Sequence, residues 1–367
     1  MEHTISTLGS HSALDVCEGA KTEGFRTLVV AQRGREKTYL GPYKSRMRDA
    51  GNGRRKEVGV VDELLLMGKF GEITKKQNLD FMKKRNCVFV PNRSFAVYVG
   101  YDAIERDFDI PVFGNKFLLR AEERDAQKNQ YHLMDRAGVR SPKKFSSPEK
   151  IDRLVIVKVS EAKRAYERAF FLARSPEEYA GRSEQMIKEG KITREHLKKA
   201  TIEEYIVGAH FNLNFFYSPV HDDLELLGVD TRRQTNIDGY LRMPADAQLE
   251  LLKMRQPSTI EVGHIACTIR ESLLEQVFDI GERFVQAVQK EYKGGIIGPF
   301  ALQGAFIEED GEKFVCFDVS MRMPGSPGTR FTPYSGYLHR ESVSFGRRIA
   351  MEVKEAEAKG MMDRITT

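Results

Sequence analysis

The sequence has few cysteines and no long apolar run. The first shortage argues against a disulfide-rich or zinc-binding protein, and the second against a membrane protein. The four cysteines, Cys17, Cys87, Cys267 and Cys316, are widely spaced within apolar patterns, which indicates reduced core thiols and neither a zinc knuckle nor a disulfide framework. No run of about 18 apolar residues occurs, and the opening MEHTISTLGSH is no basic and apolar leader. We therefore expect no membrane segment, no secretion and a cytoplasmic protein.

The sequence also has little excess charge. Its net charge is +5 with a pI near 8.8, and Lys and Arg are interleaved with Asp and Glu. This mild positive charge therefore does not require a nucleic-acid partner. A small polyphosphate ligand would suit it equally well. With 367 residues, 41% of them hydrophobic and 30% charged, the chain is globular and long enough for two or three packed lobes.

A predicted hairpin late in the chain carries the strongest signal for a site. Two apolar runs, 299–307 and 313–319, flank an Asp-Gly turn. One polar side chain interrupts each run, Gln303 in the first and Asp318 in the second. Because a buried carboxylate is costly unless it is paired or binds a metal, Asp318 with Gln303 and nearby Arg322 indicates a cation and phosphate site. The alternative is a hairpin in which Asp318 merely pairs with Arg322.

A strand, helix and strand pattern opens the chain. Residues 4–8 and 26–31 are β-rich runs on either side of an amphipathic segment, which predicts a βαβ unit. Ser10, His11 and Ser12 lie at the start of this helix, where free N–H groups and the helix dipole attract an anion. Ser10 or Ser12 also suits a simple helix cap, whereas His11 can donate to a phosphate and changes charge near neutral pH.

A second strand-to-helix turn, PNRSF, carries Ser94. Because such turns lie together at the carboxyl ends of parallel strands, Ser94 could face the same ligand as His11, although it also suits a helix cap. Between the two turns, residues 34–56 are basic and rich in glycine, and we interpret them as a surface loop.

The middle of the chain predicts strands that contain isolated polar residues. In IDRLVIVKVS, Lys158 lies among apolar residues and either reaches a nucleotide phosphate or snorkels from an edge strand; taken alone, the residue favours snorkelling. An antiparallel set of strands is then predicted for HFNLNFFYSP, DLELLGVDTRRQT and EVGHIACTIRES. An amphipathic helix is predicted from Glu275 to Tyr292.

Blocks distributed along nearly the whole chain resemble the archaeal formate-dependent FAICAR synthetases, ATP-grasp ligases of purine biosynthesis that formylate the ribonucleotide AICAR. The blocks are LGSHSALDVCEGAKTEGF, VFVPNRSFAVY, FGNKFLLRAEERD, IEEYIVG, FYSP, LELLGVDTRRQTNIDG, IRESLLEQVF and IIGPFALQ. The resemblance implies an α/β ATP-grasp fold with a βα preATP-grasp domain at 1–115. Two lobes, 116–210 and 211–367, would hold ATP between antiparallel sheets. It also implies a homo-oligomer.

The resemblance implies a role for individual residues. Formate would be activated as formyl phosphate and its formyl group passed to the amine of AICAR, with Mg²⁺ or Mn²⁺ as cofactor. Phosphoryl transfer needs charge neutralisation more than a covalent protein partner, so we expect Arg322, near Asp318, to be the catalytic cation. The residues implied in AICAR binding are His11, Ser94 and His264. Those implied in ATP binding are Arg120, Lys158, Glu203, Glu204, Tyr205, Ile206 and Gln234. Those implied in metal binding are Gln303 and Asp318.

The sequence departs from the family pattern at several of these positions. The glycine-rich loop that covers the phosphates in the family is replaced by KVSEAKRAYERAFF, which contains no glycine and would crowd or repel a phosphate. His264 replaces an Asn, Gln234 and Asp318 each replace a Glu, and Arg93 replaces a glycine. Besides the FAICAR-forming ligase, these changes keep open a non-catalytic paralogue that binds AICAR or another phosphorylated ribonucleotide, or a ligase with another substrate.

Overall fold

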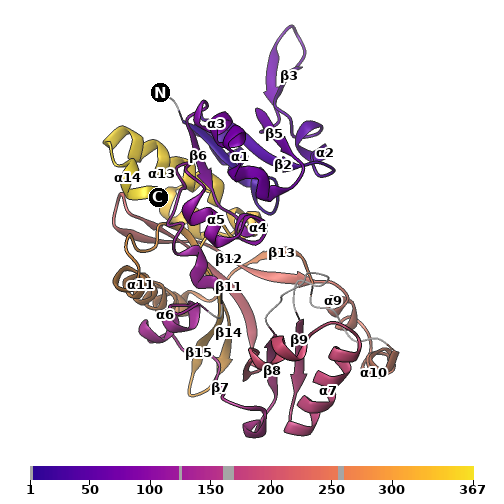
Figure 1. Cartoon of the computed structure of the whole chain (residues 1–367). Helices are drawn as coiled ribbons and strands as arrows, with labels where there is room; N and C mark the ends of the chain where they lie inside the picture. Colours follow the sequence, from indigo (N-terminus) through magenta and orange to yellow (C-terminus); the bar gives the residue numbers. More distant parts are fainter. Residues whose placement is uncertain (1–2, 124–125, 160–168, 255–259) are drawn as a thin grey trace.

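A computed structural model describes residues 3–123, 126–159, 169–254 and 260–367, which form three sheets of four or five strands, a two-stranded hairpin and their helices (Figure 1). The N-terminal sheet lies at one end, a five-stranded sheet occupies the middle, and a small sheet with its own helix lies at the other end (Figure 1). None of the helices in the described part of the chain is both long and apolar enough to cross a membrane.

The N-terminal sheet is parallel, with strand order β5-β2-β1-β6. Its strands are β1 (Thr4–Leu8), β2 (Arg26–Gln32), β5 (Glu63–Met67) and β6 (Cys87–Val90). β1 and β6 are buried along their whole length, as expected of strands covered on both faces. Helix α1 (Ala13–Thr22) connects β1 to β2, which confirms the predicted βαβ unit.

The C-terminal helix α13 (Phe345–Lys359) packs across α1 (Figure 1). The two helices approach closely because both have glycine at the crossing. A Cβ on Gly346 would lie 2.0 Å from the carbonyl oxygen of Asp15, and one on Gly19 would lie 2.0 Å from the amide nitrogen of Arg347. The end of the chain is thereby fixed to its beginning.

The remaining N-terminal elements surround this sheet. They are α2 (Lys37–Leu40), β3 (Arg46–Asp49), β4 (Arg55–Val58), η1 (Phe70–Thr74), α3 (Lys76–Lys83), α4 (Arg93–Val99) and α5 (Tyr101–Arg106). The interpretation of residues 34–56 as a plain surface loop was wrong, because β3 and β4 form an antiparallel hairpin that projects from the molecule (Figure 1). Its strands are almost wholly exposed and so carry no apolar alternation.

The small sheet is antiparallel, with strand order β7-β10-β8-β9. Its strands are β7 (Lys144–Phe145), β8 (Val155–Val159), β9 (Ala169–Ala173) and β10 (Thr201–Glu204), and its helices are α7 (Pro176–Lys188) and α8 (Arg194–Lys198). It has its own apolar core, which includes Val157, Phe171 and Ile202. The segment before it contains η2 (Leu119–Glu122) and α6 (Gln130–Arg136), and η3 (Pro148–Lys150) lies between β7 and β8.

The large sheet is antiparallel, with strand order β13-β12-β11-β14-β15. Its strands are β11 (Ala209–Ser218), β12 (Asp223–Gln234), β13 (Glu261–Cys267), β14 (Gly298–Glu308) and β15 (Glu312–Ser320). β14 and β15 pair as the predicted hairpin. Side chains from α11 (Leu274–Glu291) and α6 join those of the sheet in the largest apolar core, in which Phe215, Phe284 and Phe300 stack.

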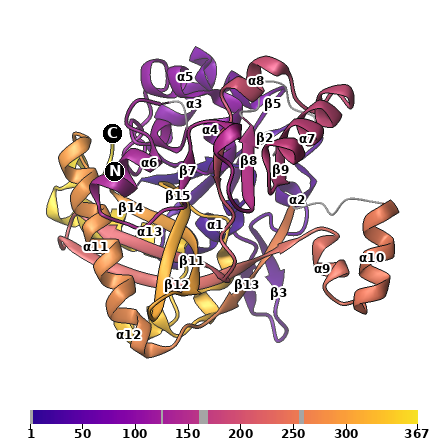
Figure 2. The same ribbon diagram turned by 90° about the horizontal axis from the view of Figure 1, so that it is seen from below.

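The other elements of this half lie at its margins. They are α9 (Ile237–Tyr240), α10 (Ala245–Met254), η4 (Glu271–Leu273), η5 (Pro327–Phe331), α12 (Tyr334–His339) and α14 (Met362–Ile365). Viewed from below, α9 and α10 extend outward beyond β13 (Figure 2).

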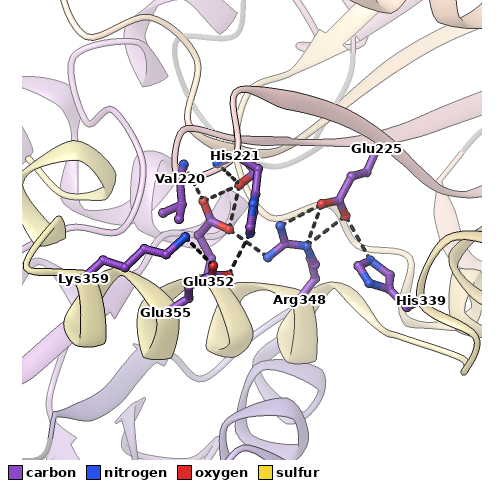
Figure 3. Close-up of polar contacts among 9 residues, drawn as sticks. Val220, His221, Glu225, His339, Arg348, Glu352, Glu355 and Lys359 are labelled. Atoms are coloured by element: carbon purple, nitrogen blue, oxygen red, sulfur yellow. Dashed lines mark hydrogen bonds and ion pairs between the residues drawn. The ribbon is translucent and has the colours of Figure 1, made fainter.

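A buried charge cluster joins α13 to the large sheet (Figure 3). Arg348 donates to both oxygens of Glu225 on β12 and, 2.9 Å away, to Glu352 on its own helix. Ser218 on β11 also donates to Glu352, and the ring of His339 lies 3.1 Å from Glu225. We call these five residues the Arg348 cluster.

Candidate active site

A row of polar side chains crosses one face of the large sheet. Asp230, Asn212, Gln303 and Asp318 are successive register partners on β12, β11, β14 and β15. Because directly opposed residues of neighbouring strands point to the same face, these four side chains share one surface. The structure therefore brings Gln303 and Asp318, the two predicted metal ligands, to directly opposed positions.

Gln303 is already held by neighbouring side chains. Its carbonyl oxygen accepts a hydrogen bond from Arg232, and its amide nitrogen donates to Ser320 at 3.0 Å. Arg232 is also paired with Glu261 at 2.8 Å. A guanidinium and a cation repel each other, so Gln303 fits a metal only once Arg232 has given up this hydrogen bond.

Asp318 is the better suited of the two predicted metal ligands. It is half-buried, and its charge acts on both Arg93 and Arg322. Within residues 3–123, 126–159, 169–254 and 260–367, no group of three or more His, Cys, Asp and Glu side chains is arranged to hold a metal ion. One carboxylate nevertheless fits Mg²⁺, because that ion usually keeps several waters and shares the phosphates of its substrate.

Lys158 connects the small sheet to the large sheet. It is 6% exposed and forms an ion pair with Glu203, which is 1% exposed and accepts a further hydrogen bond from Tyr131 at 3.0 Å. The Lys158 ammonium also donates to the carbonyl oxygen of Phe317 at 3.2 Å, directly beside Asp318. Snorkelling from an edge strand was therefore the wrong interpretation, because β8 lies between β10 and β9 and the side chain is buried.

The predicted adenine linker leads from the small sheet to the same place. The amide of Glu204 donates to Lys143 at 2.8 Å, and the amide of Tyr205 donates to Leu154 at 3.0 Å, so neither amide is free in this structure. The main chain of Ile206 hydrogen-bonds the His210 ring.

The linker's neighbours include a pair of rings. The His210 ring centre lies 5.4 Å from that of Phe317, the residue whose carbonyl oxygen accepts from Lys158. The rings are tilted by 54° to each other, so a flat base can stack on one ring and meet the edge of the other.

The predicted AICAR residues also converge. The Ser94 hydroxyl donates to Ser10 at 2.7 Å, which joins the two strand-to-helix turns. His11 adopts a left-handed backbone conformation with φ of 43° and is exposed. A Cβ on Gly325, in the loop after β15, would lie 3.1 Å from His11 Nδ1 and 3.7 Å from His264 Nε2. Both histidine rings thus lie close to Gly325.

His264 is held as a cation by two carboxylates. Its ring nitrogens lie 2.8 Å from Asp230 and 2.8 Å from Glu261, and the Ser326 hydroxyl lies 3.1 Å from Nδ1. Burial disfavours the charged ring, but the hydrogen bonds to Asp230 and Glu261 outweigh it and raise the pKa of His264 to about 9. The ring presents positive charge beside Gly325.

Arg322 lies in a cluster with a second arginine. Both Arg322, at 3.3 Å, and Arg93, at 3.4 Å, reach the same oxygen of Glu122. The other oxygen of Glu122 accepts the amide of Met321 at 2.8 Å. Burial lowers the pKa of Arg322, and the positive charge of Arg93 adds to that effect.

The structure does not join two of the predicted ATP residues to this group. Arg120 pairs with Glu105 at 3.0 Å and Asp102 at 2.6 Å on α5. The amide of Gln234, at the end of β12, donates to Asp238 at 2.6 Å. The glycine-free stretch after Lys158 falls on residues 160–168, outside the described residues, and its effect on phosphate binding stays a prediction.

The sequence analysis missed Asp230, Arg232 and Glu122. Asp230 and Arg232 carried a signal, because they alternate along β12 and so extend a polar face at a strand period of two. Glu122 carried none, since it lies in a charged run, AEERD, in which no single acid stands out.

Comparisons with known proteins agree with this architecture. A family model described as a protein of unknown function (DUF1246) matches residues 5–145, and one described as a domain of unknown function (DUF1297) matches residues 178–367. A 5-formaminoimidazole-4-carboxamide-1-(beta)-D-ribofuranosyl 5'-monophosphate synthetase from Methanopyrus kandleri is 41% identical over 99% of this chain and 95% of its own length. The protein of the same name from Methanothermobacter thermautotrophicus is 40% identical over 99% and 94%.

Solved structures show the same relationship. The IMP biosynthesis protein PurP from Thermococcus kodakaraensis has a TM-score of 0.72 and 28% identity, covering 99% of this chain and all of its own. N5-carboxyaminoimidazole synthetase from Staphylococcus aureus has a TM-score of 0.56 at 11% identity, covering 94% of this chain and 80% of its own, and shares the fold alone. The chain therefore belongs to the 5-formaminoimidazole-4-carboxamide ribonucleotide (FAICAR) synthetase family and has the ATP-grasp fold.

Proposed function

We propose that the protein is an ATP- and formate-dependent ligase that formylates AICAR to FAICAR in IMP biosynthesis. In the proposed reaction, formate takes the γ-phosphoryl group of ATP to give formyl phosphate and ADP. The amine of AICAR then attacks the formyl carbon and releases phosphate. Relatives of the same name cover nearly the whole chain, and they support this assignment.

One structural observation carries the proposal: β15 and the loop after it contact or contain residues from each of the predicted metal, ATP and AICAR groups. Phe317 accepts from Lys158, and Asp318 is opposed to Gln303. Arg322 follows, and Gly325 lies close to both His11 and His264. Groups proposed to bind a triphosphate and groups proposed to bind a ribonucleotide therefore lie along one short segment. Transfer of an acyl group between two bound substrates requires this proximity.

The described residues divide the work in the proposed reaction. Lys158 and Arg322 supply fixed positive charge where negative charge accumulates during phosphoryl transfer. Asp318 would hold Mg²⁺ or Mn²⁺, which would supply charge neutralisation on the phosphates. His11, Ser94 and His264 would bind AICAR. Glu203 to Ile206 would lie along the adenine edge, and Arg120 and Gln234 would complete the ATP site once it is filled.

The test is ADP release by the purified protein with Mg²⁺, ATP, formate and AICAR, together with detection of FAICAR by mass spectrometry. We expect ADP release to require both formate and AICAR. The proposal is wrong if no ADP appears above background while the Methanopyrus kandleri relative is active under the same conditions.

A non-catalytic paralogue that binds AICAR remains the second candidate, because the stretch after Lys158 lacks glycine and Gln303 is engaged by Arg232. Calorimetry with AICAR and ATP separately distinguishes the two candidates. Binding of AICAR without binding of ATP supports the paralogue, whereas binding of both supports the ligase.

We also propose that the protein acts in the cytoplasm as a homo-oligomer. Exposed apolar side chains on α10 support an assembly, since Leu249 is 63% and Met254 82% exposed. Light scattering on the full chain measures the oligomeric state, and a monomer at all concentrations would contradict the proposal.

A further inference from the structure

The Arg93 and Arg322 side chains come from distant parts of the sequence and meet at one carboxylate, that of Glu122. Residues Asn92 and Met323 form an isolated parallel bridge, which places the start of α4 beside the loop after β15. Arg93 directly follows Asn92, and Arg322 directly precedes Met323. Both guanidinium groups then reach the same oxygen of Glu122.

One carboxylate oxygen does not satisfy two guanidinium groups. The contacts of 3.3 and 3.4 Å are long for charge-assisted hydrogen bonds, which usually measure about 2.7 to 2.9 Å. Arg322 is only 9% exposed, and its Nε is buried with no hydrogen-bond partner in the described part of the chain. A buried donor left without a partner costs free energy, which a bound acceptor would recover.

The charges facing the pair leave room for an anion. Besides Glu122, the negative charge that acts on both arginines is that of Asp318. Asp318 is the residue that the proposed function assigns to a cation. With Asp318 so engaged, the two guanidinium groups share Glu122, and the exposed Glu123 also acts on Arg93. Arg93 is 44% exposed, so the pair is accessible from outside.

The position of the pair identifies the anion. Ser94, next to Arg93, points to Ser10 on the AICAR side, and Arg322 lies between Asp318 and Gly325 in the chain. The pair thus lies close to Asp318, which is proposed to serve the triphosphate, and next to Ser94, which is proposed to bind AICAR. The activated acid has to form and react near both groups. Planar guanidinium groups match the geometry of carboxylates and phosphates.

We propose that Arg93 and Arg322 together bind the small carboxylate substrate and the acyl phosphate made from it, with Arg93 a substrate-binding residue for formate. This inference rests on the proposed function. The ribose phosphate of AICAR and the phosphates of ATP share part of the same chemistry, so the experiment has to separate three ligands.

The experiment compares Arg93→Ala and Arg93→Lys with the wild type by measuring kcat and the KM for formate, ATP and AICAR. Arg174→Ala is the matched control, because the Arg174 side chain is 74% exposed and forms an ion pair with Glu178 on α7. We expect Arg93→Ala to raise the KM for formate by about 10- to 100-fold, as for loss of a charge-assisted hydrogen bond. The KM values for ATP and AICAR should change by less than about twofold. Arg93→Lys should recover part of the formate affinity, which a purely structural role would not require.

An unchanged KM for formate in Arg93→Ala overturns the inference, and so does a rise confined to AICAR or to ATP. Formate binding measured by saturation-transfer NMR, with Mg²⁺ and ADP present, separates this inference from the proposed function. Suppose that the wild type binds formate, that Arg93→Ala does not, and that neither protein releases ADP. The anion site is then supported, and the proposed ligase activity is wrong. If ADP is released and both proteins bind formate equally, the ligase activity is supported and the proposed anion site is wrong.

Discussion

Lys158 and Glu203 form an ion pair inside the small sheet, and the same lysine donates to the carbonyl oxygen of Phe317 in the large sheet. One ammonium group therefore links the small sheet to the large sheet. Taking both charges out of water is costly, and the pair is tolerated because Tyr131 and Phe317 satisfy further hydrogen bonds. This arrangement makes stability and nucleotide binding separable by mutation.

Replacing Lys158 by Met should destabilise the protein by about 3 to 5 kcal/mol, because Glu203 is left as an unpaired buried charge. It should also abolish ATP binding. Urea unfolding followed by circular dichroism measures the first effect and calorimetry the second. The double variant Lys158→Met with Glu203→Leu should regain most of the stability without regaining ATP binding. Recovery of ATP affinity in the double variant would mean that Lys158 does not contact the nucleotide.

Asp318→Asn and His11→Ala should have opposite effects on turnover and on AICAR binding. Asp318→Asn should lower kcat by about 100-fold or more and leave AICAR affinity unchanged, because the carboxylate acts on the phosphoryl side. His11→Ala should weaken AICAR binding by about 1 to 3 kcal/mol through loss of a charge-assisted hydrogen bond. Asp310→Asn, at the exposed turn of the same hairpin, is the control for Asp318→Asn. Equal effects of Asp318→Asn and His11→Ala on both quantities would contradict this division of roles.

The hairpin of β14 and β15 could be predicted because its signals are local. The Asp-Gly turn and the apolar runs fix the pairing, and that pairing brings Gln303 opposite Asp318. The burial of Lys158 could not be predicted, because an apolar strand that contains one lysine has the same sequence pattern at the edge of a sheet and in its interior. Its partner Glu203 lies in another segment, and sequence spacing alone does not reveal which strands become neighbours.

The arginine pair shows the same limit. Arg93 was noted as a departure from the family pattern and Arg322 as a neighbour of Asp318, but nothing local relates one to the other. Their meeting depends on the bridge between Asn92 and Met323, a contact between two lobes. Residues whose role depends on packing between lobes are therefore found only in the folded chain.

Gly325→Ala should weaken AICAR binding while the fold stays intact. The added Cβ would lie 3.1 Å from His11 Nδ1, which is tighter than ordinary contact, so the ring must move. We expect the KM for AICAR to rise by roughly 3- to 10-fold, since small displacements of a positioning group are costly. Gly328→Ala is the matched control in the following turn, because its Cβ would meet only Ala266, at 3.9 Å. A similar rise in both variants would show that the loop, and not the His11 contact, controls affinity.

The pairing of His264 should make stability depend on pH in alkaline solution. The pKa of His264 is raised from 6.5 to about 9 in the folded protein, so its contribution is fully present below about pH 6.5 and is lost as the pH rises through about 9. The full contribution is roughly 3 kcal/mol, from the conversion of a pKa difference into free energy. The difference in unfolding free energy between the wild type and His264→Asn, measured from pH 6 to about 10, should shrink over this window.

Two further variants test whether the pH effect arises from His264. Glu261→Gln removes one of the two acceptors and should shift the loss of stability to lower pH. His196→Asn, on α8, replaces a histidine of a different lobe and should leave the pH profile of the wild type unchanged. A wild-type profile retained in His264→Asn would contradict the assignment.

Arg348→Met should be among the most destabilising single substitutions in the chain, because Arg348 is the guanidinium shared by Glu225 and Glu352 (Figure 3). Arg348 is 3% exposed and the two glutamates 5% and 0%, so removing it leaves two buried carboxylates facing each other. We expect a loss of about 3 to 5 kcal/mol in unfolding free energy.

Lys359→Met on the same helix is the control for Arg348→Met. Lys359 is 46% exposed in its pair with Glu355, so we expect a loss of less than about 1 kcal/mol. Arg348→Lys should fall between Arg348→Met and the wild type, because an ammonium keeps the charge but cannot hold Glu225 through two parallel hydrogen bonds. If Arg348→Met is no more destabilising than Lys359→Met, then the apolar packing of α13 on α1 holds the C-terminal helix, and the Arg348 cluster does not.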